Sequence, residues 1–126
     1  MKEFSLGGTE RLKSRTSLNL IFFKGKTLFH KNYAVVYRCT GYDPGAPVKA
    51  AFIVPSKNIR NASGRNRIKR MMREAYRKNK KSLYNKAAEK ETGIEIALKY
   101  NGTTQPLKGE TEEKIIVLLQ RLIQKL

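Results

Sequence analysis

Four short stretches of the chain carry the apolar patterns of β-strands. Residues 33–38 alternate between two faces, with Tyr33, Val35 and Tyr37 on one and Ala34, Val36 and Arg38 on the other, and a further short strand is expected over 27–29. Small and β-branched apolar residues fill 48–54, and a last alternating stretch covers 94–100. The turn-forming residues 41–47 separate the strands at 33–38 and 48–54, so these two are predicted to pair in antiparallel fashion.

A short helix is predicted before the first strand. Ser14 or Ser17 can cap its start, and Gly25 is placed to end it. Its apolar positions follow the helical spacing i, i+3, i+4, at Leu18, Ile21 and Phe22.

Two further helices complete the predicted order α-β-β-β-α-β-α, which is an α+β arrangement. The first covers about 63–80, and the second is capped by Thr111 and continues to the end of the sequence. Residues 85–92 are polar and fit either an extension of the first helix or a loop. We expect a mobile basic segment over 1–13 and a single domain over 14–126.

Composition adds a strong positive charge to this picture. The 126 residues include 27 Lys and Arg against 10 Asp and Glu, a net charge of +17, so the partner is expected to be a polyanion. No window approaches the ~18 apolar residues of a membrane span, and the first residues lack a signal-peptide pattern. Cys39 is the single cysteine, which excludes a disulfide framework, and we expect no disulfide-linked partner. Because His30 is also the single histidine, a Cys/His zinc site is excluded as well. We therefore expect a cytoplasmic protein.

Carboxylates are scarce and scattered along the chain. Asp43 is the single aspartate and lies in a predicted turn. Phosphodiester cleavage with two protein-bound metal ions needs several carboxylates that converge on one pocket. The sequence shows no such group, so if the protein serves hydrolysis, another molecule is expected to perform the chemistry.

The charge is concentrated around the long helix. Residues 57–81 contain eleven Lys and Arg against Glu74 alone. On a helical wheel, one arc is apolar and the adjacent arc is cationic, which predicts one face on the sheet and one row of cations outside. A solvated helix face usually mixes charges of both signs, whereas this face repels itself. Arginine outnumbers lysine along it, as expected for contacts with phosphate.

The start of this helix resembles a known signature. Residues 65–77 read RNRIKRMMREAYR, and Pro55-Ser56-Lys57 and Asn61-Ala62 precede them. This segment resembles the RNR motif of the bacterial ribonuclease P protein subunit, and Arg11-Leu12-Lys13 with the following apolar residues resembles the first helix of that family. Arg60 departs from the pattern, because many members carry glycine there.

The resemblance implies a fold and a function. The fold would be a central mixed sheet, similar to domain 2 of ribosomal protein S5, in which the RNR helix joins two parallel strands by a left-handed crossover. The family's protein binds a catalytic RNA, and the holoenzyme removes the 5′ leader of precursor tRNA by hydrolysis. The RNA and its bound Mg²⁺ would perform the cleavage, and the protein would hold neither a catalytic residue nor a metal site.

Two RNA-binding surfaces follow from the resemblance. The surface for the catalytic RNA comprises Lys57, Arg60, Asn61, Arg65, Asn66, Arg67, Lys69, Arg70 and Arg73. The surface for the precursor-tRNA leader lies between the first helix and the open face of the sheet, and comprises Leu18, Phe22, Tyr33 and Tyr37. Rings beside cations would form a sequence-tolerant stacking platform there.

Alternatives remain open from the sequence. Leu18, Phe22 and Tyr37 also fit the hydrophobic core, and Asn61 and Asn66 also fit the cap of a helix. A ribosomal or other structural RNA-binding protein would show similar charge. A basic amphipathic helix on anionic lipid is disfavoured, because the modest apolar arc is needed for the core. A nuclease made of protein alone is disfavoured by the scarcity of carboxylates.

Overall fold

The computed structural model describes the backbone of residues 15–126 and the side chains from residue 18 onward. The predicted mobile segment 1–13 lies outside these described residues. The strands are β1 (Lys26–His30), β2 (Tyr33–Thr40), β3 (Val48–Ile53) and β4 (Gly93–Tyr100). The helices are α1 (Arg15–Lys24), α2 (Ala62–Asn79), α3 (Lys81–Lys90) and α4 (Glu110–Lys125).

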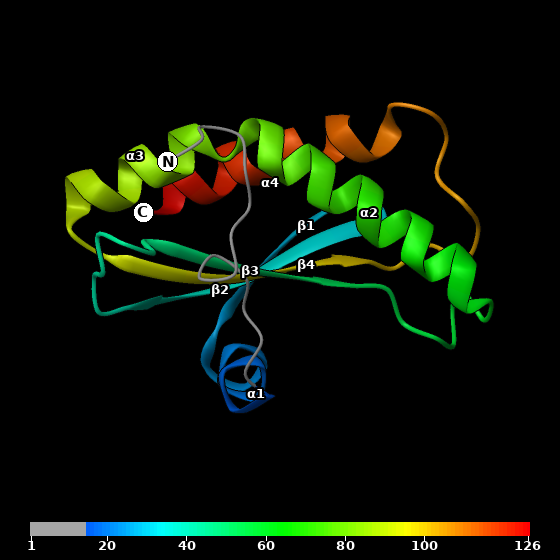
Figure 1. Ribbon diagram of the computed structural model, residues 1–126, viewed down its shortest axis with the longest axis horizontal. Coiled ribbons are helices and arrows are strands. Elements are labelled where there is room, and N and C mark those ends of the chain that lie inside the picture. The colour runs from blue at the N-terminus through cyan, green and yellow to red at the C-terminus, as the bar shows by residue number, and fades with distance from the viewer. Residues whose placement is uncertain (1–14) are drawn as a thin grey trace.

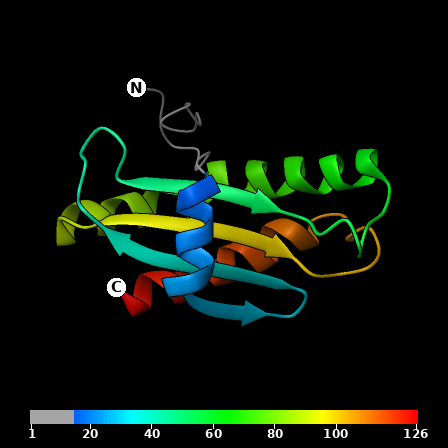
Figure 2. The same cartoon turned by 90° about the horizontal axis from the view of Figure 1, so that it is seen from below.

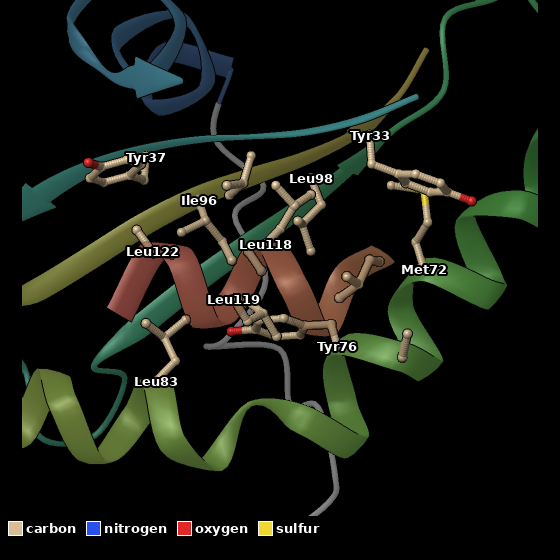
Figure 3. Packing of buried hydrophobic residues seen from close by; sticks show 14 of the residues in the cluster. Tyr33, Tyr37, Met72, Tyr76, Leu83, Ile96, Leu98, Leu118, Leu119 and Leu122 are labelled. Atoms are coloured by element: carbon tan, nitrogen blue, oxygen red, sulfur yellow. The ribbon is translucent and has the colours of Figure 1, made fainter. Parts of the chain in front are cut away.

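The four strands form one mixed sheet in the order β1-β2-β4-β3. Helices α2, α3 and α4 cover one face of the sheet, and α1 lies across the other face (Figures 1 and 2). The main core lies between the sheet and the three helices, where Met72 and Tyr76 of α2 meet Leu98 of β4 and Leu118 of α4 (Figure 3). A smaller apolar cluster lies beneath α1.

Strand β4 lies between β2 and β3, so the predicted antiparallel pairing of β2 with β3 is wrong. Ile96 of β4 is opposite Tyr37 of β2 in an antiparallel ladder, and opposite Ala50 of β3 in a parallel one. The turn residues 41–47 do reverse the chain, but they span the width of the later strand. A local turn signal carries no information about a strand inserted from about 50 residues further along.

The connection from β3 to β4 contains two helices. The chain leaves the end of β3, returns behind the sheet through α2 and α3, and enters β4 beside β3, which makes a left-handed crossover (Figure 2). Connections of this kind are right-handed in almost all folds. The handedness therefore agrees with the family resemblance and not with the general rule. Residues 81–90 form a separate helix, which Glu91 ends in the left-handed conformation (φ 50°).

The predicted helix boundaries agree closely with the structure, with two exceptions at caps. Helix α4 begins at Glu110 after Gly109, so Thr111 lies inside the helix and is not its cap. Helix α1 begins at Arg15, which places Ser17 inside it and leaves Ser14 outside the described residues. Gly25 ends α1 as predicted and donates its N–H to the carbonyl oxygen of Ile21 at 2.8 Å.

Candidate nucleic-acid interface

Asn61 begins helix α2 as its N-cap residue. Its backbone is extended (φ −75°, ψ 120°), and its Oδ1 accepts hydrogen bonds from the backbone N–H of Ser63 at 2.9 Å and from Ser63 Oγ at 2.7 Å. The bond to the backbone satisfies an N–H group that has no partner within the helix. Of the two roles open to Asn61, the structure gives it the cap, and its contact with RNA stays a prediction.

Arg65 fastens the turn that precedes α2. Its Nη1 donates to the carbonyl oxygen of Ile59 at 2.9 Å and to that of Arg60 at 2.8 Å. Both acceptors are uncharged, so the guanidinium keeps its full positive charge beside the turn. Arg60 itself does not have a positive φ, so a side chain in place of the family's glycine strains nothing, and it is exposed.

Arg67 is oriented by a residue that the sequence analysis did not identify. Its Nη1 donates to Gln105 Oε1 at 3.2 Å, and Gln105 Nε2 donates to the carbonyl oxygen of Gly64 at 3.1 Å. The loop that follows β4 is thus fastened to the first turn of α2. No local pattern could reveal this contact, because 38 residues separate the two side chains.

The cations at the start of α2 and in the loop before it are at least partly exposed, and together with the polar Asn66 we call them the α2 cationic face. It comprises Lys57, Arg60, Arg65, Asn66, Arg67, Lys69, Arg70 and Arg73. Among the described residues none of its cations forms an ion pair with a carboxylate. Arg73 instead lies over the ring of Phe52, with 5.8 Å between the guanidinium carbon and the ring centroid. The charges of this face are therefore not compensated within the described part of the chain.

Further along the same helix, a cation is neutralised. Arg77 forms an ion pair with Glu74, one turn before it. The hydrogen bond from Arg77 is the main cause that holds the pKa of Glu74 below its usual range. Arg77 therefore lies beyond the α2 cationic face. As an arginine that is already paired with a carboxylate, it can serve as a control for the arginines of that face that have no such partner.

Helix α2 presents these cations outward because its other face is in the core. The buried residues of α2 are Ile68, Met72, Ala75 and Tyr76. They are spaced at three or four residues, as an apolar stripe on one side of a helix requires. The predicted division of the helix into an apolar and a cationic arc is therefore confirmed.

Helix α1 places Leu18 and Phe22 on the opposite side of the sheet. Leu18 packs against the small cluster that Ile21 forms with Val36 and Ala97. Phe22 is 47% exposed, so its ring is available to a ligand at the border of helix and sheet. We call this surface the α1 face.

Tyr33 and Tyr37 do not lie on the α1 face, and their predicted placement beside Leu18 and Phe22 is corrected. They are 1% and 6% exposed and belong to the main core, on the helix-covered side of the sheet (Figure 3). The Tyr33 hydroxyl is 2.8 Å from Thr111 Oγ1, and burial raises the pKa of Tyr33 to about 12. Their neighbour Val36 faces α1 instead.

Another exposed aromatic residue, Phe29, lies on the α1 side of the sheet. Phe29 of β1 is 66% exposed and is the register partner of Ala34. Leu28, the preceding residue, packs against the main core, so the alternation of the strand directs Phe29 to the α1 side. Strand alternation in the sequence was the available signal for this residue.

Metal-binding groups do not gather in the described residues. No three His, Cys, Asp or Glu side chains there lie close enough to hold a metal ion. Several of the carboxylates that are present pair with cations, as Glu95 does with Arg38 at 2.6 Å. The residues described do not fit a Mg²⁺ site held by protein. Nor does any helix between residues 15 and 126 have the length and apolarity needed to cross a bilayer.

The fold and the α2 cationic face define a class of small, basic α+β proteins in which a left-handed crossover helix presents cations to solvent. Comparisons with known proteins agree. The family model for ribonuclease P matches residues 6–122. The ribonuclease P protein component of Porphyromonas gingivalis is 37% identical over 94 residues, which cover 75% of this chain and 69% of that protein. The chain belongs to the ribonuclease P protein family.

Solved structures show the same fold. The ribonuclease P protein of Staphylococcus aureus matches with a TM-score of 0.70 at 17% identity, over 90% of this chain and 94% of that one. The ribonuclease P protein of Thermotoga maritima matches with a TM-score of 0.61 at 27% identity, over 93% and 97%. The predicted fold class and the role as a protein subunit of ribonuclease P are thus confirmed. That role implies an RNA partner within a ribonucleoprotein.

Proposed function

We propose that the α2 cationic face binds the catalytic RNA of ribonuclease P. The observation that supports this most directly is the row of cations without carboxylate partners. Such a row is costly in a protein that stays alone, because neighbouring like charges on a helix repel one another. An RNA backbone removes this cost and releases counterions, which gives an affinity that falls steeply with salt. The hydrogen bond to Gln105 limits the orientations open to Arg67, which supports a role in such a contact.

The α1 face binds the 5′ leader of precursor tRNA in this proposal. Phe22 and Phe29 supply exposed rings, and bases of any identity can stack on them. Leu18 packs beneath and supports the helix. A leader differs in sequence from one precursor to another, so a surface that binds by stacking suits it better than one that reads base edges.

The catalytic RNA carries out the chemistry, and it holds the Mg²⁺ ions. Mg²⁺ bound to the RNA would supply activation of the attacking water and stabilisation of the leaving oxygen. The protein's own contribution is positive charge beside two RNA strands, which lowers their mutual repulsion and so raises the affinity for substrate and for Mg²⁺. The protein alone does not cleave, and the cytoplasm is the compartment in which it acts.

Reconstitution tests this proposal. The purified chain is combined with ribonuclease P RNA of the same organism, and cleavage of a precursor tRNA is followed as Mg²⁺ is lowered. The protein is expected to support cleavage at Mg²⁺ concentrations at which the RNA alone is inactive. Equal activity with and without the protein would refute the role in processing, and tighter binding to ribosomal RNA than to ribonuclease P RNA would point to a structural RNA-binding protein. Cleavage by the RNA-free protein would refute the division of chemistry.

A further inference from the structure

A cavity of about 500 Å³ lies at the end of the sheet opposite to the start of α2. It forms where β2 ends and β4 begins, between the ends of α1 and α4 and the last turns of α3. In Figure 2 this is the end of the sheet where α3 and the C-terminus lie, while α2 starts at the other end. The cavity shares no residue with the α2 cationic face, and of the leader-surface residues named above it includes only Tyr37.

Half of the residues that line the cavity are cations. They come from five elements and are Lys24, Lys26, Arg38, Lys86, Lys90 and Lys125. Arg38 is paired with Glu95, and Lys86 Nζ lies 3.9 Å from a carboxylate oxygen of Glu89. The other four lysines have no ion pair within the described residues. Positive charge therefore converges on this cavity from separate parts of the chain.

The floor of the cavity is apolar, in contrast to its rim. Leu126 lines it together with Tyr37, Ala87 and Ile94, of which only small parts are accessible (6%, 1% and 2% exposed). A bare inorganic anion would gain nothing from such a floor. A nucleotide has both parts, since its phosphate suits the lysines and its base and ribose suit the floor. A volume of about 500 Å³ lies within the range of ~300–1,000 Å³ that small-molecule sites occupy.

We propose that this cavity is a nucleotide-binding site, with the phosphate at the lysines of the rim and the base against Tyr37 and Ile94. The nucleotide can belong to a single-stranded RNA or be free, since both present the same chemistry. This site is additional to the two surfaces of the proposed function. Its test requires neither the catalytic RNA nor precursor tRNA, so its result is separate from that of reconstitution.

Nuclear magnetic resonance of the full chain gives the first test. The methyl signals of Ala87 and Ile94 are followed while three probes are added separately: inorganic phosphate, uridine monophosphate, and pentauridylate without a terminal phosphate. We expect uridine monophosphate to shift both methyl signals at concentrations at which inorganic phosphate leaves them unchanged. Shifts with pentauridylate as well assign the site to a nucleotide within a strand, and shifts with the monophosphate alone assign it to a free nucleotide. Unchanged methyl signals with both nucleotides overturn the proposal, as do equal shifts with inorganic phosphate.

A pair of double variants gives the second test. Lys90→Gln with Lys125→Gln removes two charges from the rim, and Lys31→Gln with Lys108→Gln removes two exposed charges elsewhere. The rim variant is expected to weaken binding of the nucleotide probe at least tenfold at ~0.1 M salt, because two of the lysines that would contact its phosphate lose their charge. The control variant is expected to change it less than about twofold. Equal weakening in the two variants would mean attraction by net charge alone and would overturn the site.

Discussion

Replacement of Arg70 by alanine measures what one cation of the α2 cationic face contributes to RNA binding. Arg70 is exposed and forms no ion pair within the described residues, so its loss should change the free energy of unfolding by less than about 0.5 kcal/mol. Each phosphate contact adds about 0.7–0.9 to the slope of log affinity against log salt concentration. Removal of one contact then weakens binding about five- to eightfold at ~0.1 M salt and about twofold at ~0.4 M.

The assay is filter binding of the catalytic RNA at four or more salt concentrations. Arg77→Ala is the matched control, because it removes the same residue type and the same net charge from the same helix, but Arg77 is already paired with Glu74. We expect the slope to fall by about one for Arg70→Ala and to stay unchanged for Arg77→Ala. An unchanged slope for Arg70→Ala, or the same fall for both variants, would refute the reasoning that unpaired cations mark the interface.

Three further predictions concern other parts of the molecule. Phe22→Ala should weaken the binding of leader-bearing precursor by about 1–3 kcal/mol and leave the binding of mature tRNA unchanged, and equal loss for both would argue against stacking on the leader. The pKa of His30 should lie below its usual value of 6.5, mainly because of desolvation and secondly because of the nearby positive charge of Arg121. Arg121→Gln should raise this pKa, and the ring signals of this single histidine measure it. Protonation of His30 then costs more in the folded than in the unfolded state, so its contribution to stability falls as pH drops through 6.5. Tyr33, with a pKa of about 12, should remain protonated at pH 11, which a difference absorbance titration against Tyr33→Phe measures. The stability linked to this raised pKa should be lost as pH rises from about 10 to 12.

The sequence predicted the elements well wherever local signals were strong. The helix expected over 63–80 is found at Ala62–Asn79, and its cationic arc is outside as expected. Gly25 ends α1 because any side chain would clash there: a Cβ would lie 2.2 Å from the carbonyl oxygen of Ile21 and 2.8 Å from that of Tyr37. Signals of this kind depend only on neighbouring residues along the chain, so a single sequence is enough to detect them.

The sequence failed where the answer depends on which side of the sheet a residue faces. Residues 33–37 of β2 are buried on both sides, so hydrophobicity could not decide between Tyr37 and Val36 as the neighbour of α1. The bulky rings lie under the thick layer of three helices, and small side chains such as Ala97 lie beneath the single helix. Gln105 was missed for a related reason, since its contact with Arg67 depends on where a distant loop returns.

The unequal layers on the two sides of the sheet affect how the molecule opens. Helix α1 is held by a small cluster around Ile21, whereas the other helices share the whole main core. Elements with few buried apolar contacts open locally at a much lower free energy than global unfolding. The amide hydrogens of α1 should therefore exchange with solvent faster than those of α2 and α4. A strand that binds between α1 and the sheet would slow this exchange, so the helix that borders the α1 face also reports on its occupancy.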